Sequence, residues 1–169
     1  MTRRVVTGHR DGKGTVLYDG EAPNRKLRQA SGLVSTLLWV TDECPADISG
    51  LADRAEREIG VAPPPLGSIF RVVEFPPDRK EMSRDAVLRE MGLSGQKQSK
   101  HAGMHRTRSV DYAVVMEGEI DMILDDGEVR LAAGDVLVQQ GTDHAWVNRG
   151  ERPCRIAFVL IDAADPIDR

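Results

Sequence analysis

The sequence predicts an all-β fold in which many short strands close into a sandwich or barrel. Turn signals recur at short intervals after residue 104, in the stretches 125–128, 132–135, 139–143 and 148–153. Asp126-Gly127 lies between two apolar stretches and is typical of a two-residue hairpin turn. The segments between these turns are too short for helices, so we expect a strand in each of them.

The N-terminal part predicts two further strands that are separated by a long loop. Residues 32–42 are rich in β-branched residues, and residues 68–75 form an apolar stretch that two prolines end. Residues 44–67 are polar and end in a run of prolines, which predicts a loop. A short helical turn near residues 51–59 is an open alternative within that loop.

One short helix is predicted at about residues 83–91. Ser83 can cap its first turn, and Gly92 is typical of a helix end. The polar residues 94–103 then connect this helix to the β-rich part. We expect one structural domain, with residues 1–100 as an N-terminal extension and residues 101–169 as the barrel core.

Composition and charge exclude several classes of partner. The formal net charge is −4 and the pI is about 5.6, and the arginines are scattered along the chain. We therefore expect no nucleic-acid partner and no membrane partner, because both favour a basic face. No apolar run approaches the ~20 residues that cross a bilayer. The charged N-terminal segment lacks the apolar segment of a secretory signal after it, so we expect no such signal. The two cysteines, Cys44 and Cys154, form no C-x-x-C pair, so a cytoplasmic location is expected.

Two motifs contain the candidate functional residues. The first includes His105, Thr107, Asp111 and Gly118, and the second is the stretch 134–148, GDVLVQQGTDHAWVN, which includes His144. Together they resemble the two signature motifs of the cupin superfamily over about residues 104–162. The resemblance implies a double-stranded β-helix, or jelly-roll barrel, with its site inside the barrel mouth. It also implies that the N-terminal extension packs on the barrel or on a second subunit, so we expect a homodimer.

Residue by residue, the resemblance places His105 and Thr107 on the two histidines of the first motif. Asp111 falls on its glutamate, and His144 on the histidine of the second motif. It implies a divalent transition metal (Fe, Mn, Zn or Ni) bound by His105, Asp111 and His144, with no organic cofactor. Because aspartate is shorter than glutamate, two roles stay open for Asp111: a direct ligand, or a group that acts through water or orients a histidine. Gln139 or Gln140 stands where the family has a proline.

Strand alternation favours this assignment. In a regular strand, His105, Thr107, Ser109 and Asp111 share one face, which continues into Ala113 and Val115. A shifted alignment would instead place Met104 and Arg106 on the histidine positions. In the stretch 68–75, the same alternation separates Arg71 from Glu74. We expect one of these two side chains to point into the barrel or to form an ion pair at an interface or surface. If Arg71 points into the barrel, it would bind a substrate carboxylate.

The predicted function is a small-molecule enzyme with His105, His144 and Asp111 as catalytic residues. Oxygenase, isomerase, dehydratase and cyclase chemistry all stay open. The predicted substrate-binding residues are Thr107, Trp146, Arg71 and Val115, and the inferred apolar walls are Val115, Trp146, Phe158 and either Val136 or Val138. The alternative is a non-catalytic domain that binds or senses a small ligand, which the loss of one histidine favours.

Overall fold

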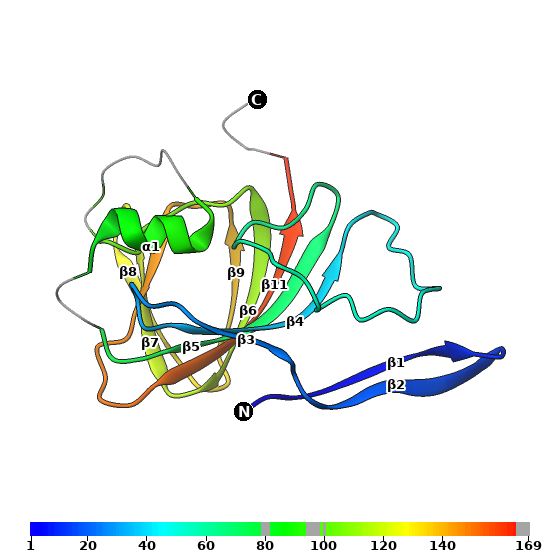
Figure 1. Ribbon diagram of the computed structural model, residues 1–169. Coiled ribbons are helices and arrows are strands. Elements are labelled where there is room, and N and C mark those ends of the chain that lie inside the picture. The colour runs from blue at the N-terminus through cyan, green and yellow to red at the C-terminus, as the bar shows by residue number, and fades with distance from the viewer. Residues whose placement is uncertain (79–81, 94–98, 100, 165–169) are drawn as a thin grey trace.

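The computed structural model describes residues 1–78, 82–93, 99 and 101–164 and confirms the predicted all-β class (Figure 1). The predicted connector at 94–103 lies partly outside these residues. No helix in the described part of the chain has the length and apolar character that a membrane crossing requires. The predicted homodimer stays a prediction.

Two sheets form the barrel. The larger has six strands in the order β3-β4-β5-β11-β6-β9, and the smaller has three in the order β10-β7-β8. The strands of the larger sheet are β3 (Asn24–Leu27), β4 (Val34–Thr41), β5 (Ser68–Phe75), β6 (Ser109–Glu117), β9 (Val136–Gln140) and β11 (Cys154–Asp162). The strands of the smaller sheet are β7 (Glu119–Leu124), β8 (Glu128–Ala132) and β10 (His144–Val147). The predicted hairpin turn at Asp126-Gly127 joins β7 to β8.

Apolar side chains from both sheets fill the space between them. Ile69 and Ile156 come from the larger sheet, and Ile120 from the smaller one, and all three are fully buried in one core. Burial of each such side chain contributes ~1.5–3 kcal/mol. β5 lies between β4 and β11 in the sheet, so residues on both sides of position 100 share one core. The domain boundary drawn at residue 100 itself stays a prediction.

An N-terminal hairpin projects away from the barrel in Figure 1. It consists of β1 (Arg3–Arg10) and β2 (Lys13–Glu21), which pair only with each other among the described residues. Arg4 attaches this hairpin to the rest of the molecule, because its guanidinium donates to Leu38 O at 3.0 Å and pairs with Asp53. Both members of the pair are buried, so they form a structural link rather than a surface contact.

The predicted helix is confirmed as α1 (Arg84–Met91), which lies across one end of the barrel (Figure 1). The Ser83 side chain accepts from Ala86 N, and Gly92 ends the helix in the left-handed conformation, with φ of 75°. Val87 and Leu88 are buried. Glu90 accepts the Ala30 N–H at 3.0 and 3.1 Å, which ties the helix to the segment between β3 and β4.

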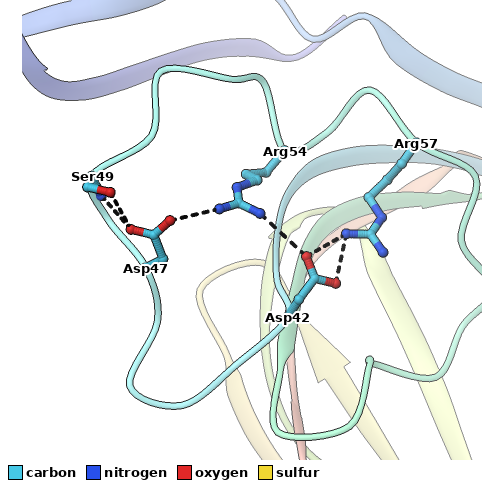
Figure 2. Close-up of polar contacts among 5 residues, drawn as sticks. All are labelled: Asp42, Asp47, Ser49, Arg54 and Arg57. Atoms are coloured by element: carbon cyan, nitrogen blue, oxygen red, sulfur yellow. Dashed lines mark hydrogen bonds and ion pairs between the residues drawn. The ribbon is translucent and has the colours of Figure 1, made fainter.

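The long loop between β4 and β5 contains no helix, so the alternative of a helical turn near 51–59 is wrong. Side chains within the loop pair with one another instead (Figure 2). Arg57 donates to both oxygens of Asp42 at 2.8 and 2.7 Å, and Arg54 bridges Asp42 and Asp47. Asp47 in turn accepts from Ser49. These contacts fix an irregular path that brings residues 60 and 61 against α1.

A close approach at Gly60 holds α1 in place, and Gly60→Ala is expected to weaken it. Val61 N donates to Met91 O at 2.9 Å, and a Cβ on Gly60 would lie 2.9 Å from the same oxygen. We expect a loss of about 2 kcal/mol in the free energy of unfolding, since backbone must move. Urea unfolding measures the loss. Gly50→Ala is the control, because a Cβ there has open space. Equal stability of the two variants would contradict the prediction.

Candidate functional site

A cavity between the two sheets, beneath α1, collects the sequence-predicted polar residues. It is lined by residues of the larger sheet, the smaller sheet, α1 and the loop before β5. His105, Thr107, Asp111, His144, Trp146 and Arg71 all line it. Alternation along 105–115 is as predicted, because every odd-numbered residue in that stretch is buried and Arg108 is exposed. The shifted alignment through Arg106 is therefore excluded.

His105 and His144 are held side by side by the backbone. Each N–H donates to the carbonyl of the other, at 2.9 and 3.0 Å, and the ring centroids are 4.6 Å apart. His105 Nδ1 lies 2.8 Å from Gly103 O, and His144 Nδ1 lies 2.9 Å from Thr142 O. A carbonyl can only accept, so Nδ1 of His105 carries the proton. Nδ1 of His144 also lies 3.1 Å from the Gln139 amide nitrogen, and it carries the proton in the tautomer that donates to the shorter contact, Thr142 O. Nε2 of each ring is then the nitrogen with the lone pair.

Burial keeps both rings neutral near neutral pH. It lowers the pKa of His105, and it lowers the pKa of His144 to about 3, with the neighbouring His105 adding to the effect. An imidazole without charge is a base rather than an acid. Two bases with available Nε2 atoms therefore lie at one wall of the cavity.

Gln139 is a site residue that the sequence analysis treated only as a departure from the family pattern. Its Nε2 donates to Thr142 O at 3.0 Å, the same carbonyl that accepts from His144, and its Oε1 accepts from Gly141 N at 3.3 Å. Gln139 is buried and lies opposite Asp111 in the β6–β9 pairing. It therefore fixes the turn that orients His144. Alternation from a predicted strand at 136–140 could have placed it inside the barrel.

A chain of hydrogen bonds runs from Thr107, just before β6, to Asp111 within it. The hydroxyls of Thr107 and Ser109 lie 2.9 Å apart, and Ser109 Oγ donates to Asp111 Oδ1 at 2.6 Å. Burial raises the pKa of Asp111 to about 6, although the Ser109 bond and the Arg71 charge both oppose the rise. Asp111 can thus hold or release a proton near neutral pH, which is the property of a general acid or base.

The predicted metal ligands lie around the same cavity, but they do not converge. No group of three His, Cys, Asp or Glu side chains in the described part of the chain is arranged to hold a metal ion. The two imidazoles would fit as ligands through Nε2, whereas Asp111 is held by Ser109. The set of His105, Asp111 and His144 is therefore not assembled in this arrangement, and a metal there stays a prediction.

Arg71 points into the barrel, as one of the two alternatives predicted, and is only 5% exposed. Its Nη2 donates to Gly60 O at 2.7 Å, whereas its Nε has no hydrogen-bond partner. Burial lowers the pKa of Arg71 to about 10, with a further lowering by the nearby charge of Arg28. The guanidinium is still protonated at neutral pH and is a buried cation.

Aromatic rings form the apolar wall of the cavity. The Trp146 ring centroid lies 5.5 Å from that of Phe158, in an edge-on arrangement, and 6.1 Å from that of Phe75, in a tilted one. Trp146 and Phe158 thus lie where the sequence predicted a wall. Leu33, Val61 and Met91 complete this wall from the loops and α1, and the sequence analysis assigned none of them to the site.

Three of the predicted wall residues do not line the cavity. Val115 is buried in the core that Ile156 also occupies, so the prediction that it binds substrate is not supported. Val136 and Val138 are 71% and 61% exposed on the outer side of β9. On β9 the inward positions belong to Leu137 and Gln139, because side chains alternate and Gln139 faces Asp111.

Comparison with known proteins agrees with the fold and the motifs. The Cupin domain family model matches residues 94–161. The chain is 32% identical to phomopsin biosynthesis cluster protein C' of Diaporthe leptostromiformis, over 95% of this chain and 78% of that protein. It is 31% identical to the cupin-domain-containing oxidoreductase virC of Hypocrea virens, over 95% of this chain and 76% of that protein.

A solved structure matches nearly the whole fold. It is named as an ethanolamine utilization protein Q from Salmonella typhimurium, and it covers 97% of this chain and 98% of its own. The TM-score is 0.50 at 10% identity, so the likeness concerns the fold alone. The barrel, the two motifs that meet across its cavity and a relative above 30% identity lead to one conclusion: the chain belongs to the cupin family.

Proposed function

We propose that this protein is an enzyme that transfers protons to and from a small organic molecule in the barrel cavity. The observation that carries the proposal is the pair of neutral imidazoles, whose Nδ1 atoms are tied to backbone carbonyls and whose rings line an apolar cavity. The names of relatives such as virC, a cupin-domain-containing oxidoreductase, support an enzyme rather than a structural barrel.

The chemistry follows from the positions of the titrating groups. His105 or His144 accepts a proton through Nε2, which carries the lone pair of the ring when Nδ1 donates to a backbone carbonyl. Asp111 supplies or takes up the second proton, because its pKa of about 6 keeps both forms accessible. Trp146, Phe158 and Leu33 exclude water and hold the apolar body of the substrate.

No step of this chemistry passes through a metal, because the three predicted ligands are not assembled. A divalent metal at His105, Asp111 and His144 is nevertheless testable. Elemental analysis of protein from metal-supplemented medium is the measurement. About one equivalent of a transition metal that is lost in both His105→Ala and His144→Ala would replace the proton-transfer proposal with a metal centre.

Hydrogen–deuterium exchange of a model ketone tests proton transfer without knowledge of the substrate. We expect the protein in D₂O to accelerate exchange at the carbon next to the carbonyl of phenylacetone, followed by NMR. His105→Ala and His144→Ala should each lower the rate about a hundredfold. His9→Ala is the control, because His9 is exposed on β1. Equal rates in all variants would contradict the proposal. Binding of phenylacetone without exchange would support the non-catalytic alternative.

A further inference from the structure

Arg71 is a buried cation without an acidic partner. It forms no ion pair within 4.0 Å of a described carboxylate, and its one recorded hydrogen bond goes to a backbone carbonyl, Gly60 O. A buried guanidinium whose Nε–H donates to nothing carries an uncompensated desolvation cost. Such a group is stable in a fold when another component supplies the missing acceptor. The cavity is the place from which that component can reach it.

The acids that line the cavity are engaged elsewhere. Asp111 accepts from Ser109, and Glu90 accepts the Ala30 N–H with both oxygens. Arg71 lies opposite Phe158 on β11, and Asp111 lies opposite Leu160 on the other side of the same strand. Two strand spacings therefore separate their backbones, roughly 10 Å. Asp111 attracts the guanidinium from this distance and opposes the lowering of the Arg71 pKa by burial, but neither acid forms an ion pair with it.

A second, smaller cavity adjoins Arg71 and is cationic. It shares Arg28, Ser35 and Arg71 with the main cavity, and its lining is completed by Asn24, Lys26, Leu37, Arg57 and Ile59. No acidic side chain lines it among the described residues. Lys26 and Arg57 are paired with Glu58 and Asp42 outside this lining, whereas Arg28 adds a second positive charge next to Arg71. The potential at this end of the site thus favours an anion.

The apolar part of the lining determines what kind of anion fits. Trp146, Phe158 and Leu33 line the main cavity, so the ligand carries an apolar body. A guanidinium offers planar, paired donors that match a carboxylate. A free inorganic anion would use the charge but leave the aromatic wall without a contact.

We propose that the cavity binds an organic carboxylate, with its carboxylate group on Arg71 and its apolar body against Trp146 and Phe158. The inference names the substrate class of the site described under the proposed function and therefore rests on that function for its meaning. Arg28 adds attraction without contacting the apolar body. The unpartnered Nε of Arg71 receives its acceptor from the ligand.

Phenylacetate and phenylacetamide test the inference, because they share shape and differ in charge at pH 7.5. Isothermal titration calorimetry should show that the protein binds phenylacetate at least tenfold more tightly. Arg71→Met should abolish that preference, so that this variant binds the acid no more tightly than the amide. Arg25→Met, at an exposed position of β3, should keep it. Equal affinity of the wild-type protein for acid and amide would overturn the inference, and this comparison needs no variant.

Two further measurements separate Arg71 as a ligand-binding residue from Arg71 as a structural one. Without ligand, Arg71→Met should melt at or above the wild-type temperature, because a buried unpaired charge has been removed. Arg71→Lys keeps the charge but loses the planar fork, so its preference for phenylacetate should fall between those of the wild type and Arg71→Met. A lower melting temperature of Arg71→Met with an unchanged preference for phenylacetate would overturn the inference.

The remaining outcomes distinguish a carboxylate from a phosphate ligand, and failure of the proposed function from failure of this inference. Inorganic phosphate that competes with phenylacetate at equal concentration would overturn the carboxylate in favour of a phosphate site. If phenylacetate binds through Arg71 but phenylacetone shows no exchange, the proposed function fails and the inference stands. If phenylacetone exchanges while acid and amide bind equally, the inference fails alone.

Discussion

Replacement of Arg4 by methionine is expected to lower the free energy of unfolding by about 3 kcal/mol. The reason is that Asp53 would keep its charge in a buried position without its partner. The side chains of Arg4 and Asp53 are 8% and 7% exposed, and Arg4 also holds the pKa of Asp53 below its ordinary value. The same substitution removes the bond to Leu38 O and leaves the β1–β2 hairpin held by fewer contacts, among them the bond from Tyr18 to Leu51 O. Urea unfolding followed by circular dichroism measures the loss.

The control for this prediction lies one residue away. Arg3 pairs with Asp19 on the exposed side of the same hairpin, so Arg3→Met should leave the stability unchanged within error. The double variant Arg4→Met/Asp53→Leu should recover most of the loss, because no charge then stays buried. A double variant that is as unstable as Arg4→Met would show that packing, and not the unpaired carboxylate, explains the effect.

The parts of the site that could be predicted are those governed by strand alternation. His105, Thr107 and Asp111 occupy successive inward positions of one chain segment, so a period of two places them in the barrel without any tertiary information. The position of His144 came instead from the resemblance of the second motif to the cupin signature. The helix was predictable because Ser83 and Gly92 mark its ends by local backbone chemistry.

The parts that could not be predicted depend on contacts between distant segments. Loop 42–67 is rich in charged residues that could have supported a helix, but Arg57 pairs with Asp42 from the end of β4 instead (Figure 2). The same tertiary contacts bring Val61 and Met91 to the cavity. For Val115, strand alternation correctly predicted a side chain that points into the barrel. It could not predict that this side chain lies in the packed core, beyond the end of the cavity.

The site therefore combines both halves of the chain. The motif residues supply the imidazoles and the carboxyl group, whereas β5 and the loops supply Arg71 and the carbonyl of Gly60 that holds it. A family motif contained in residues 104–148 cannot specify Arg71 or Gly60, which lie outside it. This division explains why family membership predicts the position of the site but not its ligand.

Asp111→Asn is expected to change how stability depends on pH. In the folded protein the pKa of Asp111 is about 6, against an ordinary 3.8, so the folded state binds this proton more tightly than the unfolded state. Stability contributed by Asp111 is therefore lost as pH rises from about 4 to 6. The difference between the folded and unfolded pKa values of Asp111 corresponds to about 3 kcal/mol in the free energy of unfolding. Relative to the wild type, Asp111→Asn should gain that amount between pH 4 and pH 7, as measured by urea unfolding at each pH.

His144→Gln is expected to change the pH dependence of stability in the opposite direction to Asp111→Asn. The pKa of His144 falls from 6.5 to about 3 on folding, so the folded state binds its proton more weakly and the wild type loses stability as pH falls below 6.5. His144→Gln should therefore gain stability relative to the wild type in acid, where Asp111→Asn does not. Because each comparison is a difference between pH values, pH-independent costs of either substitution cancel. Parallel pH profiles of the wild type and Asp111→Asn would show that Asp111 does not titrate near pH 6. Of the three proposed catalytic residues, the two imidazoles would then be left for proton transfer.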